Sequence, residues 1–269
     1  VKQLMPSYSK TKGWVGMILF SLAFMFFSIG LARPQIGAKL KEHQSKGAEV
    51  MIALDVSNSM LAQDYSPDRL QRAKLAISRL VDKLNGDRIG LVLFAGTSFV
   101  QLPITTDYVS AKMFLGNIST ESVPVQGTAI GDAINTCIKS FSAQSENSRA
   151  IIVITDGENH EDNPVEAAKT AASMGISVYT IGVGSAQGQP IPMKGGLQKD
   201  SQGNIVVTKL DEATLKEVAK AGNGAYVHAG NNEFGLNPVI DNIRKLNDEE
   251  FNSIVFEEYD EQYMYCLLY

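Results

Sequence analysis

Residues 49 to 59 read EVMIALDVSNS, and this stretch decides which class of fold the chain adopts. Its first half is an unbroken apolar run, typical of a strand that is buried on both faces in a parallel sheet. Its second half is a loop that holds an acid and two serines. Further apolar, strand-like runs follow at residues 88–95, 150–155, 177–183 and 224–228. We therefore start from a sheet whose first strand ends in polar side chains.

Segments with helical periodicity separate these runs. In the first, Leu70, Ala73, Ile77 and Leu80 recur at helical spacing. Ser66-Pro67-Asp68 predicts its start, with a hydroxyl cap, a proline at the first helical position and an acid near the positive end. The periodicity continues to about Leu84. Further helices are expected at residues 107–115, 129–141, 164–174, 212–221 and 233–245.

Strands that alternate with helices predict an α/β fold: a doubly wound, mostly parallel sheet with helices on both faces, as in Rossmann-like proteins. Residues 98–102 (SFVQL) alternate in polarity and predict a short edge strand that pairs with residues 88–95. Residues 185–208 are rich in Gly, Gln and Pro, and we expect them to form a surface flap.

The polar loops of this fold predict a metal site. Asp55, Ser57 and Ser59 alternate along the loop after the first strand, so their oxygens can converge. Thr128 begins a helix and Asp156 ends a strand, and a doubly wound fold brings both to the same edge of the sheet. An all-oxygen set suits Mg²⁺ or Mn²⁺, with Ca²⁺ as a further candidate, and does not suit Zn²⁺.

The motifs DVSNS, GT and TDG together resemble the metal-ion-dependent adhesion site of von Willebrand factor A domains. The resemblance implies that Asp55, Ser57, Ser59 and Thr128 are metal ligands, directly or through water. It implies that Asp156 is a further ligand or accepts hydrogen bonds from groups around the ion. In this family one coordination position stays open for an acidic side chain of a partner protein.

The stretches LARPQ, DVSNSMLAQD, VLFAGTSFVQLPIT, QGTAIGDAI and ITDGENHED resemble the membrane-bound Bat proteins, which are associated with bacterial aerotolerance. The resemblance covers nearly the whole chain. It implies a membrane complex whose other members are a second A-domain protein, TPR proteins and a MoxR-type AAA ATPase. It also implies the cytoplasmic membrane as the location, and we expect the A domain to face the periplasm.

Simpler interpretations of the metal-site residues stay open. The two serines could cap a helix, Thr128 could be only the N-cap of its helix, and Asp156 could be a turn residue before Gly157. A structural metal that fixes three loops is also open. A phosphohydrolase of the haloacid dehalogenase type would need a second acid where Ser57 stands, so we expect no enzyme.

The residues around the predicted site have less specific roles. The loop after Asp156 is crowded with ionisable side chains, which suggest a solvated acidic rim, a second metal site or a general base: Glu158, His160, Glu161 and Asp162. Met60 follows the serines and could form an apolar lip toward a partner, or could pack in the core.

The ends of the chain have the composition of membrane segments. Residues 14–32 hold nineteen residues without a charge, enough to span a bilayer. We divide the chain into a juxtamembrane segment (1–13), a transmembrane helix (14–32), a linker (33–48), the A domain (49–247) and a tail (248–269). The aromatic residues of this tail predict the start of a second span. The net charge of −5 argues against a nucleic-acid partner.

Overall fold

The computed structural model describes residues 10–31, 35–39, 47–84, 86–141, 148–159, 161–193, 195–229, 239, 242–243 and 258–261. The chain divides into two compact units. The first comprises residues 1–44 and 254–269, and the second comprises residues 45–253. Each unit is described by itself.

The first unit contains one long apolar helix, α1 (Lys10–Leu31). Residues Thr11–Ser28 have a mean hydropathy of 1.4, and none of this window is buried. Its length and composition fit a membrane span, as the sequence predicts. Strand β1 (Gln35–Lys39) pairs antiparallel with β12 (Glu258–Glu261).

The β1–β12 pair differs from our expectation for the end of the chain. Residues 258–261 form a strand where the start of a second span was predicted, and β1 lies within the predicted linker. The composition of β12 gives the reason, since EYDE holds three acids in four residues, which is unfavourable for a membrane helix. Residues 262–269 lie outside the described residues.

The second unit is built on a six-stranded sheet with the order β11-β6-β5-β2-β3-β4. Neighbouring strands run parallel except for β4, which is antiparallel to β3. The strands are β2 (Glu49–Asp55), β3 (Arg88–Phe94), β4 (Ser98–Thr105), β5 (Arg149–Thr155), β6 (Ile176–Gly182) and β11 (Asn223–His228). The predicted α/β fold and edge strand are confirmed.

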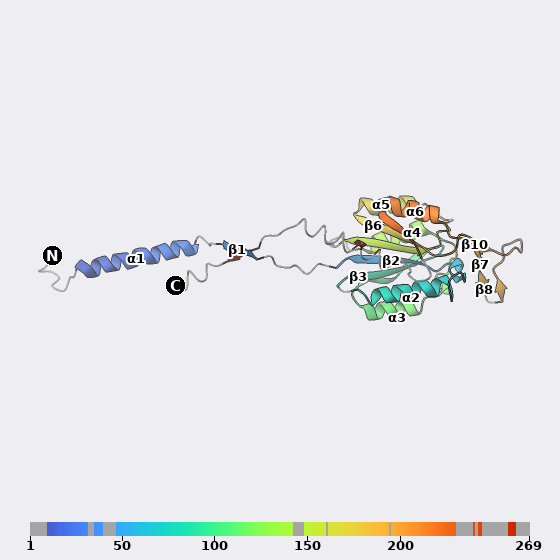
Figure 1. Ribbon diagram of the computed structural model, residues 1–269, viewed down its shortest axis with the longest axis horizontal. Coiled ribbons are helices and arrows are strands. Elements are labelled where there is room, and N and C mark those ends of the chain that lie inside the picture. Colours follow the sequence, from blue (N-terminus) through green and yellow to red (C-terminus); the bar gives the residue numbers. More distant parts are fainter. Residues whose placement is uncertain are drawn as a thin grey trace. The chain divides into compact units, whose positions relative to one another are not determined.

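Helices cover both faces of this sheet (Figure 1). Helices α2 (Arg69–Val81) and α3 (Tyr108–Gly116) lie on one face. The other face carries α4 (Ile130–Ser140), α5 (Pro164–Ser173) and α6 (Glu212–Ala221). Alternate residues of β2 belong to the two resulting cores: Val50, Ile52 and Leu54 pack with the α2 side, while Met51 and Ala53 pack with the α4 side. Burial on both faces explains the unbroken apolar run in the sequence.

Helix α2 begins and ends differently from the prediction. It starts at Arg69, and Asp68 is the N-cap, whose side chain accepts a hydrogen bond from the Gln71 amide at 2.7 Å. Ser66 and Pro67 therefore precede the helix, because the carboxylate takes the capping role. The helix ends at Val81 rather than near Leu84, because the amides of Lys83 and Leu84 bond to carbonyls three residues back in a tighter turn.

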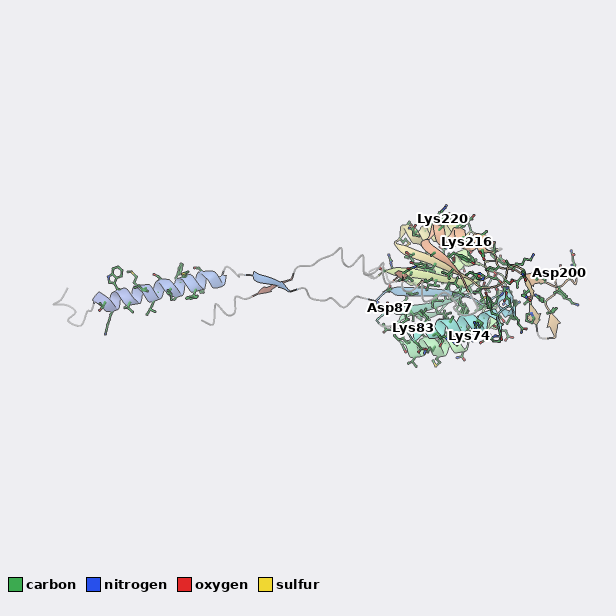
Figure 2. All side chains as sticks on the ribbon, viewed as in Figure 1. Lys74, Lys83, Asp87, Asp200, Lys216 and Lys220 are labelled. Atoms are coloured by element: carbon green, nitrogen blue, oxygen red, sulfur yellow. The ribbon has the colours of Figure 1, made fainter. Side chains whose placement is uncertain are left out.

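Two antiparallel pairs of short strands lie within the flap, residues 185–208. Strand β7 (Gln189–Pro190) pairs with β10 (Val207–Thr208), and β8 (Pro192–Met193) pairs with β9 (Gly196–Leu197). Asp200 of the flap and Asp87, which precedes β3, lie at opposite ends of the domain in Figure 2. The flap is therefore at the end where the parallel strands finish. Apart from Val239, Asn242 and Ile243, the helix predicted at residues 233–245 lies outside the described residues.

Candidate metal site

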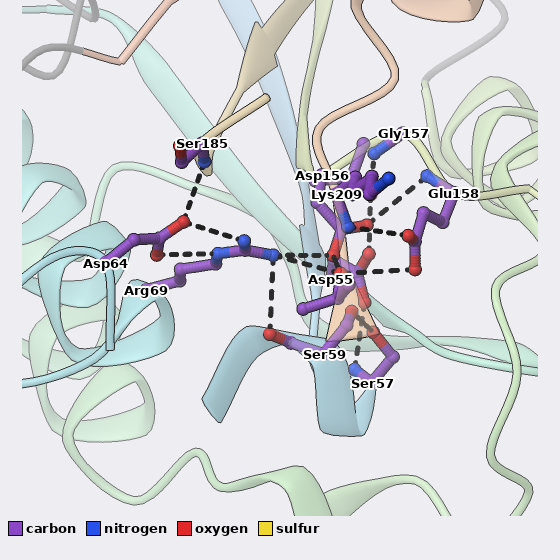
Figure 3. A network of polar contacts seen from close by, with 12 residues as sticks. Asp55, Ser57, Ser59, Asp64, Arg69, Asp156, Gly157, Glu158, Ser185 and Lys209 are labelled. Carbon is purple, nitrogen blue, oxygen red and sulfur yellow. Dashed lines mark hydrogen bonds and ion pairs between the residues drawn. The ribbon is translucent and has the colours of Figure 1, made fainter. Parts of the chain in front are cut away.

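The first motif forms a compact cluster of buried oxygens where β2 ends (Figure 3). Asp55 is the last residue of β2, and the 3₁₀ helix η1 (Asn58–Leu61) follows. Asp55, Ser57 and Ser59 have exposed fractions of 0%, 4% and 8%. The Ser57 amide donates to Asp55 Oδ1 at 2.8 Å, and the hydroxyl oxygens of Ser57 and Ser59 are 2.9 Å apart. The structure thus brings these three predicted ligands together.

Thr155 holds the second oxygen of Asp55 and was not among the predicted site residues. Its hydroxyl donates to Asp55 Oδ2 at 2.5 Å and accepts a hydrogen bond from the Gly157 amide at 3.1 Å. The pairing of β2 with β5 places Leu54 beside Ile154, so Asp55 and Thr155 are the next residues on adjacent strands. Knowledge of this strand register would have identified Thr155.

The loop of the second motif is bonded both to the first motif and to the loop after β3. The Asn58 amide donates to Gln126 Oε1 at 3.0 Å, which joins the two loops two residues before Thr128. The Ala129 amide donates to the Ala95 carbonyl at 2.8 Å. Gly127 has a φ of +131°, which other residues rarely adopt, and a Cβ there would lie 3.2 Å from Gly96 Cα. This close approach of two loops requires glycine.

Thr128 is buried but does not cap helix α4, so the capping interpretation of this residue is wrong. The N-cap is Ala129, which makes no side-chain cap hydrogen bond. The first amides of α4 are instead satisfied by the loop after Asp156. Asp162 accepts from the amides of Gly131 and Asp132, and Asn159 accepts from the amide of Ile130. The helix is capped without the threonine hydroxyl.

The third motif places a second buried carboxylate near the first. Asp156 is fully buried, and its Oδ2 accepts from Arg69 Nη1 at 2.9 Å and from the Thr208 hydroxyl at 3.0 Å. Its Oδ1 accepts from the Glu158 amide at 3.3 Å. Arg69 already neutralises the charge of Asp156, so the geometry favours a role as hydrogen-bond acceptor beside an ion over direct ligation.

Arg69 is a second member of the site that the sequence did not indicate. Its side chain is fully buried, and it forms a two-pronged ion pair with Asp64 at 2.7 and 2.8 Å besides its bond to Asp156. The charge and hydrogen bonds of Arg69 outweigh burial and lower the pKa of Asp64. In the sequence, the first residue of a helix is usually solvated. Asp64, five residues before Arg69, was the one feature of the sequence that could have suggested this ion pair.

The electrostatics distinguish Asp55 from Asp156. Burial, followed by the charge of Asp156, raises the pKa of Asp55 to about 7, and the hydrogen bonds from Ser57 and Thr155 act in the opposite direction. A buried carboxylate whose charged form is this unfavourable is stabilised by a nearby cation. Asp156 forms a salt bridge with Arg69, which also pairs with Asp64. Asp55 forms no salt bridge with any described residue.

The donor set fits a small divalent ion. Mg²⁺ binds oxygens at about 2.1 Å in octahedral geometry, which puts adjacent ligands about 3 Å apart. The hydroxyl oxygens of Ser57 and Ser59 are 2.9 Å apart in a mutual hydrogen bond, so both could become adjacent ligands with little movement. Within the described part of the chain, no group of three or more His, Cys, Asp or Glu side chains could hold a metal. A site here therefore depends on the serine and threonine hydroxyls.

The residues predicted around the site have three different outcomes. Met60 is fully buried in the core that α2 covers, so the packing alternative is confirmed and the apolar lip is wrong. Glu158 Oε1 accepts from the Lys209 amide at 2.7 Å and Oε2 lies 3.1 Å from the Thr208 hydroxyl oxygen, so Glu158 anchors the chain that leaves the flap. His160 lies outside the described residues.

Comparison with known proteins identifies the family. A family model for the von Willebrand factor type A domain matches residues 49–223. The chain belongs to this family. The A domain is 53% identical to BatB of Bacteroides thetaiotaomicron, with a TM-score of 0.71, over 74% of this chain and all of that one. It is 52% identical to an aerotolerance-related membrane protein of Bacteroides fragilis, with a TM-score of 0.72 and the same coverage.

Two more distant relatives extend this comparison. A UPF0353 protein of Nocardia farcinica is 30% identical over 91% of this chain and 76% of its own length. Proximal thread matrix protein 1 of the mussel byssus is 19% identical, with a TM-score of 0.55, over 75% of this chain and 46% of that one, and its structure has a zinc-occupied MIDAS motif. The last likeness shows the fold alone. The chain is thus an A-domain protein similar to the Bat membrane proteins, which is consistent with an interaction module.

Proposed function

We propose that the chain is a membrane-anchored interaction module whose A domain binds a partner protein through one divalent ion, Mg²⁺ in the cell. Asp55, Ser57, Ser59 and Thr128 would hold the ion, and Asp156 would accept hydrogen bonds from groups around it. When bound, the ion would supply an open coordination position for a carboxylate oxygen of the partner. The observation that carries the proposal is the buried Asp55, which has hydroxyl and amide partners but pairs with no cationic side chain among the described residues.

The chemistry of the site supports Mg²⁺ over softer metals, because all the proposed ligands are oxygens. Mn²⁺ and Ca²⁺ are the other ions that such ligands accept. The zinc found in the byssus protein supports divalent binding by this fold, and it makes Zn²⁺ a necessary arm of any binding test. With only one direct carboxylate, the bound ion keeps a positive charge that favours an acidic partner.

The membrane setting comes from α1 and from the membrane-protein relative. We place the chain in the bacterial cytoplasmic membrane with the A domain in the periplasm, as part of a Bat-type complex that supports aerotolerance. The partners proposed on this basis are a second A-domain protein, TPR proteins and a MoxR-type AAA ATPase. Protease accessibility in spheroplasts tests the orientation, since a periplasmic domain is degraded without cell lysis.

The partner proposal is tested by capture from solubilised membranes with the full chain as bait. We expect a protein that is recovered with Mg²⁺ and lost with chelator, and that is lost with Asp55→Ala or Thr128→Ala. Asp82→Ala, on the exposed surface after α2, is the matched control and should capture normally. Crosslinking and mass spectrometry then locate the contact. Replacing the partner's crosslinked acid by its amide should abolish capture, and equal recovery with and without chelator would contradict the proposal.

Catalysis and a purely structural ion are the competing functions. Ser57 occupies the position where a phosphohydrolase would need a second acid, and its hydroxyl lies against Ser59. Mg²⁺-dependent hydrolysis of a phosphate ester that disappears in Asp55→Ala would establish an enzyme. A metal-dependent rise in melting temperature without any effect on partner capture would establish a structural ion.

A further inference from the structure

The two ends of the flap are bonded to side chains of the candidate metal site. At its start, the Ser185 amide donates to Asp64 Oδ2 at 2.7 Å. At its end, the Thr208 hydroxyl lies 3.0 Å from Asp156 Oδ2 and 3.1 Å from Glu158 Oε2. The flap thus leaves and rejoins the domain at carboxylates of one network (Figure 3).

Arg69 connects these two ends. Its Nε and Nη2 donate to the two oxygens of Asp64, while its Nη1 donates to Asp156 Oδ2 and, at 3.2 Å, to the Thr208 hydroxyl. A planar guanidinium can make this set of bonds in several directions at once, whereas an ammonium cannot. The complete burial of Arg69 makes each bond costly to lose.

The backbone entering the flap is fitted to this guanidinium. Gly184 has a φ of +135°, and a Cβ at this position would lie 2.8 Å from Arg69 Cζ. The peptide before Ser185 therefore packs directly on the face of the arginine group. A shift of Arg69 would displace the first residue of the flap as well as the last.

We propose that Arg69 is a positioning residue that couples occupation of the metal site to the order of the flap. The electrostatic field of Asp156 acts on Asp55, and Arg69 with Thr208 holds Asp156 in place. An ion at Asp55 would also attract Asp156, so its binding would favour one arrangement of Asp156, Arg69 and the flap. Coupling of two equilibria is reciprocal, so an ordered flap would strengthen ion binding equally.

This inference needs one part of the proposed function, which is that the site binds an ion; it does not need the partner protein. Its test combines two measurements on the full chain in detergent. Calorimetric titration gives the Mg²⁺ affinity. The second measurement is the rate of tryptic cleavage after Lys199, which is exposed in the flap, followed by mass spectrometry with Mg²⁺ or chelator. We expect Mg²⁺ to slow this cleavage by about fivefold or more in the wild type.

The variants separate coupling from folding. Arg69→Lys keeps the charge but loses the forked geometry. This variant should still bind Mg²⁺, although more weakly, and Mg²⁺ should no longer slow cleavage after Lys199. Arg79→Lys, on the exposed side of the same helix, is its matched control. Because Arg69→Lys could fail to fold, Thr208→Val provides a second route, since it removes only a hydroxyl. Thr170→Val, on the exposed side of α5, is the control for that change.

Loss of protection in Arg69→Lys or Thr208→Val, with both controls like the wild type, supports the coupling. Mg²⁺ binding that leaves the cleavage rate at Lys199 unchanged in the wild type overturns the coupling and leaves the proposed function intact. The absence of any Mg²⁺, Mn²⁺ or Zn²⁺ binding overturns both. Protection that persists in folded Arg69→Lys and Thr208→Val overturns the role of Arg69 alone.

Discussion

The two ends of strand β2 each carry a buried carboxylate, and they differ in what neutralises it. Glu49 at the start is 1% exposed and pairs with Arg88 Nη1 at 3.0 Å on the neighbouring strand. Asp55 at the end is 0% exposed, and it accepts hydrogen bonds from the Ser57 amide and the Thr155 hydroxyl. A charged side chain of the same chain pairs with the first carboxylate. The carboxylate of Asp55 is instead the kind that a cation from outside the chain would neutralise.

The largest expected effect comes from removing the charge of each of these two acids in turn and comparing the Mg²⁺ affinities. Asp55→Ala should lower Mg²⁺ affinity by more than about a hundredfold, beyond the range seen when groups behind the ligands are removed. Glu49→Gln should leave the affinity unchanged, because the two carboxylates lie at opposite ends of the strand. Titration calorimetry of both variants makes the comparison, and an equal loss in Glu49→Gln would break it.

A second test uses pH. The folded-state pKa of Asp55 is raised from 3.8 to about 7, so in the metal-free protein this group favours folding at low pH and loses that contribution as pH rises toward 7. Metal binding requires the ionised form. Mg²⁺ affinity should therefore fall about tenfold per pH unit below 7 and level off above it. A flat affinity between pH 5 and 8 would show that Asp55 is already ionised and paired.

The hydroxyl behind Asp55 should have a smaller effect. Thr155→Val keeps the shape of the side chain but removes the hydrogen bond to Asp55 Oδ2, so Mg²⁺ affinity should fall by about tenfold. Thr180→Val is a demanding control, because Thr180 is also buried and bonds to the Leu215 carbonyl away from the metal site. Affinity that falls equally in both variants would indicate general loosening of the sheet.

The smallest effect is expected at the other end of β2. Arg88→Met leaves Glu49 without its cation and should lower the free energy of unfolding by about 1 kcal/mol, since Arg88 is half exposed. Mg²⁺ affinity should stay at the wild-type value. Chemical denaturation and calorimetry measure the two quantities separately, and a loss of metal affinity here would remove the distinction between the two ends.

The sequence predicts the sheet and the three motif loops because their signals are local. Runs such as residues 50–54 are apolar on both faces, and DVSNS contains three oxygen donors at alternate positions. Helix boundaries were less predictable. Ser66 and Asp68 are both good caps, and only the packing of the loop selected the carboxylate.

The roles of Arg69, Thr155 and Thr208 could not be predicted in this way. Each depends on contacts between residues 50 to 140 positions apart, such as Arg69 with Thr208 and Thr155 with Asp55. A buried arginine at the start of a helix has the same local pattern as a solvated one. For Met60 the sequence left an apolar lip and core packing both open, and the burial of its side chain confirms the packing.

The central claim is that Asp55 receives a divalent ion that the A domain then offers to a partner's acid. Crystals of the A domain grown with Mn²⁺, which scatters anomalously, test its first half most directly. We predict one strong anomalous peak within bonding distance of Asp55 or its water shell, flanked by the hydroxyls of Ser57, Ser59 and Thr128. No peak there at saturating Mn²⁺, or an intact peak in Asp55→Ala, would contradict the account.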